Sequence, residues 1–263
     1  MILERIVQSK REEVAAHKAT VPVQDLKARI RDLPPPRDFH AALNRRSSGG
    51  RIRVIAEVKR ASPSQGIIRP DFDLAQVVGA YAGSGASALS VLTDEPFFHG
   101  SLQDLARAKA SVSLPLLRKD FILDPYQVYE TRAWGADAIL FIAAVLDAES
   151  LQDLLALCSE VGLHPLTEVH TREDLEKVVA TKAPIVGINN RDLNTFRVSL
   201  ETTFALLPEI PADRVVVSES GISDYKEVTR LEVAGVDAIL IGEGLLRAPD
   251  VGEKLREVLG SGG

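Results

Sequence analysis

The amino-acid sequence predicts an α/β fold, a (β/α)8 TIM barrel with an N-terminal helical extension. From Arg51 onward, short apolar runs rich in β-branched residues alternate with helical segments. A glycine, a tight turn and an apolar run also recur at 85–92, 135–142 and 235–242, which indicates a repeated building block. The length, 263 residues, suits such a barrel, which takes about 250 residues. An open doubly wound sheet is the structural alternative.

Eight apolar runs are candidate strands of the barrel. They are 52–58, 88–92, 114–119, 138–143, 164–169, 185–189, 215–219 and 238–242. Several are almost continuously apolar, as expected for parallel strands that are covered on both faces.

The first fifty residues have a different pattern. Apolar residues at helical spacing predict an amphipathic helix at the N-terminus; they are Ile2, Leu3, Ile6, Val7 and Val14. A second helix is expected at 26–33, before three prolines that end it, and a third from Phe39 to Leu43. We expect residues 1–50 to pack on the barrel as part of a single domain that spans residues 1–263.

The composition restricts the function class. A formal net charge of −6 disfavours binding to nucleic acid or to a membrane surface. The only cysteine, Cys158, allows no intramolecular disulfide, and the early acidic residues are unlike a secretory signal. The histidines lack metal-ligand spacing, so no metal is expected. These observations predict a cytoplasmic protein.

Charged and polar side chains stand where the predicted strands end. In a (β/α)8 barrel the active site lies at the carboxyl ends of the strands. Side chains alternate along a strand, so Glu57 and Lys59 should point the same way. Residues of this kind at five strand ends, held in one pocket, favour acid–base chemistry on a polar, anionic substrate. The strand-end residues are Glu57, Lys59, Arg118, Lys119, Asp120, Glu168, Asn189, Asn190, Arg191, Asp192 and Glu219.

Two glycine-containing loops predict a phosphate site. They follow the seventh and eighth strands, at 220–222 and 242–244. Phosphate commonly binds at these loops in barrels, because glycine allows close backbone approach and helix N-termini favour anions. The loop at 60–66 is long enough to cover the pocket.

The same segments carry a family resemblance. The sequences IAEVKRASPS from Ile55, LRKDFI from Leu117 and PLTEV from Pro165 resemble those of indole-3-glycerol phosphate synthases. GINNRDL from Gly187, SESGI from Ser218 and LIGE from Leu240 complete the series in the same order. The resemblance covers nearly the whole chain, with small departures at Thr167 and Asn190.

The resemblance implies a reaction and a set of roles. The family closes, decarboxylates and dehydrates 1-(2-carboxyphenylamino)-1-deoxyribulose 5-phosphate to indole-3-glycerol phosphate, without a metal or an organic cofactor. It implies that Lys119 is the general acid, Glu168 the general base, and Lys59 the partner of the substrate carboxylate. How the two lysines share the acid work stays open.

The remaining implied roles concern binding. Supporting contacts to these groups and to the substrate hydroxyls would come from Glu57, Asn189 and Glu219, and positive charge from Arg191. The phosphate would be held by Ser62, Ser220, Gly221, Gly242 and the backbone of Glu243. The aromatic ring would pack on Phe121, Leu140 and Leu193.

Two other functions compete with this interpretation. A phosphoribosylanthranilate isomerase would need a cysteine and an aspartate at strand ends, whereas Cys158 lies in a predicted helix. A barrel that binds a phosphorylated metabolite or a partner protein without turnover would not need both an acid and a base. The expected partner is a small-molecule substrate, and the expected state is a monomer.

Overall fold

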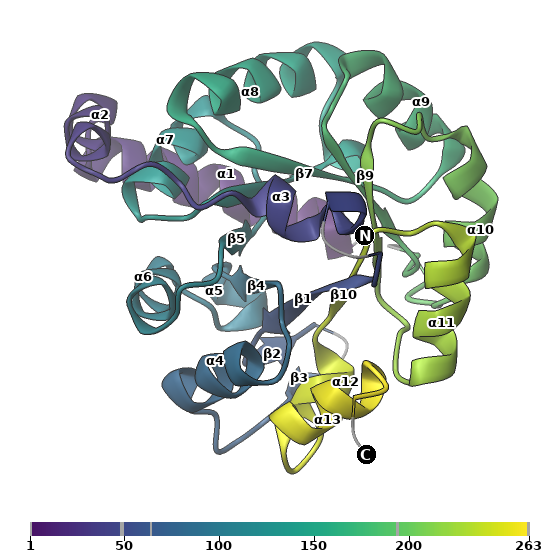
Figure 1. Cartoon of the computed structure of the whole chain (residues 1–263). Coiled ribbons are helices and arrows are strands. Elements are labelled where there is room, and N and C mark those ends of the chain that lie inside the picture. The colour runs from purple at the N-terminus through teal and green to yellow at the C-terminus, as the bar shows by residue number, and fades with distance from the viewer. Residues whose placement is uncertain (1, 48–49, 64, 193–194, 262–263) are drawn as a thin grey trace.

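Parallel strands close into a barrel in the computed structural model, which describes residues 2–47, 50–63, 65–192 and 195–261. Neighbouring strands in chain order pair in parallel, and the last strand pairs with the first, with Ala238 opposite Arg53. Within the described residues the barrel has eight strands (Figure 1), which confirms the predicted fold class. The strands are β1 (Arg53–Val58), β4 (Ala88–Leu92), β5 (Leu116–Lys119), β6 (Ala138–Ile142), β7 (His164–Val169), β8 (Ile185–Asn189), β9 (Val215–Glu219) and β10 (Ala238–Ile241).

Four strands are one or two residues shorter than predicted. The strand expected at 114–119 begins at Leu116, because Pro115 has no N–H to donate to the ladder. The strand expected at 238–242 ends at Ile241, because Gly242 stands at the N-terminus of a helix. The strand expected at 52–58 begins at Arg53, and the one at 138–143 ends before a 3₁₀ turn, η2 (Ala143–Val145).

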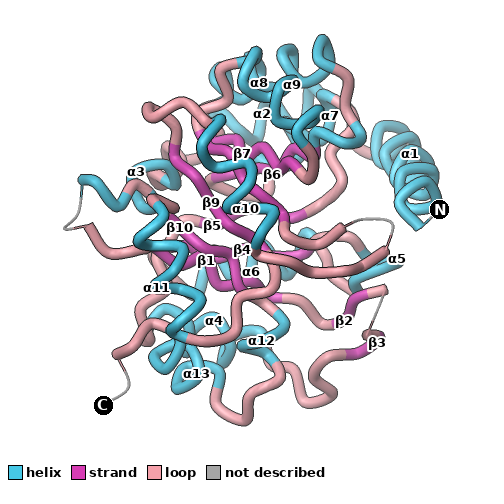
Figure 2. Tube along the Cα trace, turned by 90° about the vertical axis from the view of Figure 1, so that its right-hand side faces the viewer, coloured by secondary structure: helices cyan, strands magenta, loops and turns pink. Residues whose placement is uncertain are grey.

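Helices surround the barrel (Figure 2), and at least one helix follows each barrel strand along the chain. They are α4 (Leu74–Gly83), α5 (Glu95–Phe98), α6 (Leu102–Ser111), α7 (Pro125–Ala133), α8 (Ala148–Val161), α9 (Arg172–Thr181), α10 (Glu201–Leu206), α11 (Tyr225–Ala234), α12 (Glu243–Leu246) and α13 (Val251–Val258). Two further 3₁₀ turns are η1 (Arg45–Ser47) and η3 (Leu207–Glu209). The loop after β1 contains an unpredicted hairpin of β2 (Ala61–Ser62) and β3 (Gly66–Ile67).

The repeated glycine turns have a common structural basis. Gly135 and Gly235 adopt φ of +86° and +108°, a left-handed conformation that favours glycine after a helix. Two residues later, the carboxylates of Asp137 and Asp237 accept backbone N–H groups at the starts of neighbouring strands, at 2.8 and 3.0 Å. The turn therefore also fixes the strand beside it.

The N-terminal residues form three helices that reach both ends of the barrel. They are α1 (Ile2–Thr20), α2 (Val23–Arg31) and α3 (Phe39–Leu43), so the second helix starts and ends earlier than predicted. Figure 2 shows α3 and α1 at opposite ends of the barrel. Phe39 and Leu43 of α3 are fully buried in the apolar cluster that fills the barrel interior. Because α3 closes the barrel at the amino-terminal ends of the strands, the end where the strands have their carboxyl termini remains for a functional site.

Two other apolar clusters lie between the barrel and its helices. Cys158 is buried in one of them, where burial raises the pKa of its thiol. No helix in the described part of the chain combines the length and the apolar character needed to cross a membrane.

Candidate active site

A cavity at the carboxyl ends of the strands gathers the predicted site residues. Its wall includes every residue to which the family resemblance assigns a role except Leu193, which lies outside the described residues. Of the other predicted strand-end residues, Asp120 lines the cavity, whereas Arg118, Asn190 and Asp192 do not. The predicted residues that line the cavity are Glu57, Lys59, Ser62, Lys119, Phe121, Leu140, Glu168, Asn189, Arg191, Glu219, Ser220, Gly221, Gly242 and Glu243. Residues spread over nearly 190 positions of sequence therefore meet in one place.

A lysine and two carboxyl groups form the charged centre of the cavity. Lys119 Nζ lies 2.9 Å from Oε2 of Glu168 and 3.7 Å from Oε2 of Glu219. With Glu57, these residues come from β1, β5, β7 and β9, which are alternate strands of the barrel. Alternate strands fill one layer of a barrel interior, usually with apolar side chains. Here that layer is charged, which favours a chemical role over a purely structural one.

Burial and pairing set the proton distribution in this layer. Burial by itself lowers the pKa of Lys119, but the carboxyl groups of Glu168, Glu219 and Glu57 raise it above its usual value. Burial raises the pKa of Glu168, but the Lys119 ammonium, together with His170 and with hydrogen bonds from Lys119 and Glu219, lowers that pKa overall. Burial and the neighbouring Glu168 raise the pKa of Glu219. The centre therefore pairs a charged Lys119 with an ionised Glu168, and Glu219 is the carboxyl group that takes up a proton more readily.

Glu57 and Lys59 share one face of their strand, as the alternation predicts. Lys59 Nζ donates to Oε1 of Glu57 at 2.7 Å. Burial raises the pKa of Glu57, but the ammonium groups of Lys59 and Lys119 lower it overall. A Cβ added at Gly242 would lie 2.6 Å from Oε1 of Glu57, so this position needs glycine to accommodate the carboxylate.

Gly187 makes room for Glu219 in a similar way. A Cβ added at Gly187 would lie 2.2 Å from Oε1 of Glu219 and 3.2 Å from Cδ1 of Leu166. No rotation of an alanine side chain relieves such a contact, so the Glu219 carboxyl group would have to move. Its distance to Lys119 would then change.

We expect Gly187→Ala to lower kcat about tenfold, because small displacements of groups around a reacting centre have large effects on rate. Steady-state kinetics would measure this loss. Gly79→Ala is the matched control, since an added Cβ in α4 has no atom within 4 Å. Equal kcat values for the two variants would contradict the importance of the Glu219 position.

The two glycine-containing loops meet at one side of the cavity. Ser220 and Gly221 both have positive φ, 68° and 77°, and Ser220 Oγ donates to Oδ1 of Asn189 at 2.9 Å. The same Asn189 oxygen accepts the backbone N–H of Arg191 at 3.0 Å. Gly242 to Gly244 line the cavity where α12 begins, and the Arg191 guanidinium lies 3.9 Å from the Glu243 carboxylate. This side combines backbone groups, hydroxyls and a guanidinium, which suit an anion.

Apolar side chains also line the cavity, and some of them belong to residues that the sequence did not reveal. Phe121 and Leu140 line it as predicted, and the rings of Phe98 and Phe121 lie 6.2 Å apart between centroids. Ile2 and Ile6, from the first turns of α1, also line the cavity. Their helical spacing was visible in the sequence, but nothing in it told which end of the barrel α1 would cover.

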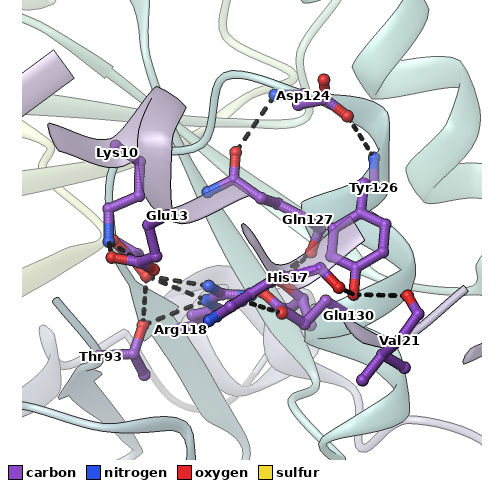
Figure 3. Close-up of polar contacts among 12 residues, drawn as sticks. Lys10, Glu13, His17, Val21, Thr93, Arg118, Asp124, Tyr126, Gln127 and Glu130 are labelled. Atoms are coloured by element: carbon purple, nitrogen blue, oxygen red, sulfur yellow. Dashed lines mark hydrogen bonds and ion pairs between the residues drawn. The ribbon is translucent and has the colours of Figure 1, made fainter. Parts of the chain in front are cut away.

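A buried ion network that includes Lys10, Glu13 and Arg118 (Figure 3) joins α1 to the barrel. Lys10 is fully buried, and its Nζ lies 2.9 Å from Asp120, 3.1 Å from Asp94 and 2.9 Å from Glu13. Asp120 also binds Arg118 at 2.9 Å. Asp120 directly follows Lys119, so the network joins α1 to the strand end that carries the central lysine. The sequence held one sign of this buried network. Lys10 is four residues from both Ile6 and Val14, so it lies on the same, buried face of the helix.

The geometry supports proton transfer on a small molecule that has an apolar part and an anionic part. A charged lysine, an ionised carboxylate and a protonatable carboxyl group lie within contact distance of one another. Cys158, by contrast, is buried in the cluster behind α8 and is not part of the described cavity wall. Fold and site together place the chain among the (β/α)8-barrel enzymes that carry out acid–base chemistry.

Comparison with known proteins identifies the family. The family model described as indole-3-glycerol phosphate synthase matches residues 3–258. A protein of that name from Dehalococcoides mccartyi is 50% identical over 98% of this chain and all of its own length. Another from Desulforamulus reducens is 47% identical over all of this chain and 98% of its own. The chain belongs to the indole-3-glycerol phosphate synthase family.

Solved structures of lower identity agree on the fold. The 3-hexulose-6-phosphate synthase of Salmonella typhimurium matches 80% of this chain and 98% of its own, with a TM-score of 0.64 and 12% identity. The tryptophan synthase complex of Pyrococcus furiosus has a chain that matches 79% of this one and 98% of its own, with a TM-score of 0.58 and 17% identity.

Proposed function

We propose that this chain is a carboxy-lyase of tryptophan biosynthesis that converts 1-(2-carboxyphenylamino)-1-deoxyribulose 5-phosphate to indole-3-glycerol phosphate, carbon dioxide and water. Membership of the family supports this reaction. The observation that carries the residue roles is the contact of Lys119 with Glu168 in a cavity that is also lined by apolar side chains and by two anion-compatible loops.

Lys119 acts as the general acid in ring closure. The ring carbon that bears the carboxylate attacks the substrate carbonyl, and the carbonyl oxygen gains negative charge. The raised pKa of Lys119 keeps it charged, so it first donates a hydrogen bond to the carbonyl. The developing alkoxide is a stronger base than an amine, so it takes the proton and becomes a hydroxyl group.

Loss of carbon dioxide follows ring closure. The electron pair of the broken carbon–carbon bond returns to the cationic ring system, and no metal or organic cofactor is needed. Lys59 neutralises the substrate carboxylate before this step. Its side chain lies at the cavity wall and is 15% exposed, so its ammonium can contact a bound carboxylate in addition to Glu57.

Glu168 acts as the general base in the final dehydration. It accepts a proton from the ring-closed intermediate, while the hydroxyl group takes a proton from the ammonium of Lys59 and leaves as water, and the aromatic indole forms. Before substrate binds, the ammonium of Lys119 lowers the pKa of Glu168 against the effect of burial, so Glu168 enters the reaction ionised. Asn189 and Glu219 hold these groups and the substrate hydroxyls.

The substrate phosphate binds at the loops of Ser220, Gly221, Gly242 and Glu243, with Ser62 from the first loop. Arg191 contributes positive charge on the same side of the cavity. The aromatic ring packs on Phe121 and Leu140.

We expect Ser220→Asp to raise KM for the phosphorylated substrate at least tenfold, because like charges repel and a tenfold change corresponds to about 1.4 kcal/mol. Ser220→Asn is the matched control. Asparagine and aspartate both tolerate the left-handed backbone found here, so the two variants differ only in charge. Steady-state kinetics on both variants would test this, and equal KM values would place the phosphate elsewhere.

The reaction itself is tested by mixing the purified protein with 1-(2-carboxyphenylamino)-1-deoxyribulose 5-phosphate and following indole fluorescence. We expect a rising signal without added metal or cofactor. Saturable binding of this compound without any indole signal would instead support a barrel that binds a phosphorylated metabolite.

A further inference from the structure

A histidine behind the cavity touches Glu168. His170 follows β7 and lies two residues after Glu168, which places both side chains on one side of the strand if its geometry continues. His170 Nε2 lies 3.3 Å from Oε1 of Glu168, whereas Oε2 of the same carboxyl group lies 2.9 Å from Lys119. The two oxygens of Glu168 therefore face different partners.

The surroundings of His170 indicate that this contact is specific. Its side chain is 7% exposed and does not belong to the described cavity wall, so it reaches the site only through Glu168. Neither ring nitrogen makes an aligned hydrogen bond within the described residues. A buried polar group without a partner costs about 1–3 kcal/mol, so the Glu168 carboxylate is the group that stabilises this ring position.

The backbone fixes His170 in place. Its N–H donates to Oδ2 of Asp174 at 3.1 Å, and the next residue, Thr171, caps α9 through a hydrogen bond to the N–H of Asp174. The ring is thus attached to the start of a helix outside the barrel. Contacts around catalytic groups are commonly long in isolation and shorten in the reacting complex, so 3.3 Å is compatible with an N–H···O bond there.

We propose that His170 is a positioning residue, which holds Oε1 of Glu168 so that Oε2 stays directed at Lys119 and the substrate. This inference rests on the role of general base proposed for Glu168. The titratable groups facing Glu168 are Lys119 from β5, Glu219 from β9 and His170, and Glu57 from β1 also acts on the Lys119 ammonium. His170 is the group that approaches from outside the cavity. A donor at this place also favours the ionised form of Glu168, which is the form that accepts the proton.

The test compares two replacements of His170 in the full chain. His170→Leu removes both nitrogens at similar volume, and His170→Gln keeps an N–H donor near the Nε2 position. We expect the leucine variant to lower kcat about tenfold with little change in KM, and glutamine to restore most of the loss. His164→Leu is the control, because His164 begins the same strand at the far end of the barrel.

A single-turnover measurement separates the steps. Carbon dioxide is released before the step assigned to Glu168, so in His170→Leu its release should keep the wild-type rate while indole fluorescence lags behind. The inference is overturned if the wild-type protein turns over and the leucine variant matches it, or if carbon dioxide release and indole fluorescence slow together in the leucine variant. Failure of the wild-type protein to form indole is a different outcome, since it overturns the proposed reaction.

Discussion

Replacing Lys119 by methionine is expected to lower kcat by a factor of about 10² to 10⁴, the usual contribution of a general acid. Methionine keeps most of the volume of the lysine side chain and removes only its charge and its donors. The carbonyl oxygen would then develop negative charge without a proton donor, in a site where burial makes an uncompensated charge costly. The loss should therefore appear in kcat, which steady-state assays of indole formation would measure.

Two further variants make the Lys119 prediction specific. Lys226→Met removes an exposed lysine on α11 and should leave kcat unchanged. Lys59→Met removes the ammonium proposed to face the substrate carboxylate, and we expect it to raise KM more than Lys119→Met does. Near-wild-type kcat for Lys119→Met would remove Lys119 from its role. A larger loss of kcat for Lys59→Met than for Lys119→Met would assign the acid work to Lys59.

The sequence predicted the barrel and the charged site for the same physical reason. A buried parallel strand must be apolar, so charged residues stand out where a strand ends, and parallel strands end on one side of the barrel. Glu57, Lys119, Glu168 and Glu219 could therefore be assigned to one place before their distances were known. The spacing of Glu57 and Lys59 also predicted that they share a face, and the 2.7 Å contact between them confirms it.

Other features depend on contacts between segments far apart in the chain, which local patterns do not encode. The periodicity of α1 predicted a helix, but not that Ile2 and Ile6 would line the cavity at one end while Phe39 closed the other. The need for glycine at Gly187 follows from a carboxyl group on the neighbouring strand. His170 gave no signal as a site residue, because its contact with Glu168 depends on how the chain leaves β7.

Replacing Lys10 by methionine is expected to lower the free energy of unfolding by about 3–5 kcal/mol, the usual effect of removing one partner from a buried ion pair. Lys10 is fully buried, and burial would lower its pKa, but Asp120, Asp94 and Glu13 raise it and keep it charged. Without it, Asp94 and Asp120, both nearly inaccessible to solvent, would face each other with less positive charge. Urea unfolding, analysed by linear extrapolation, would measure the loss.

The controls for Lys10→Met come from the same helix and the same network. Lys18 of α1 pairs with Asp124 at 2.7 Å, but its side chain is 47% exposed, so Lys18→Met should cost less than about 1 kcal/mol. Adding Asp94→Asn to Lys10→Met should recover part of the lost stability, because it removes one unpaired charge and asparagine still caps α5. Equal stability of the Lys10→Met and Lys18→Met variants would show that the buried lysine does not hold α1.

If Lys10 does hold the helix, Lys10→Met should also raise KM, because Ile2 and Ile6 would no longer be fixed against the cavity.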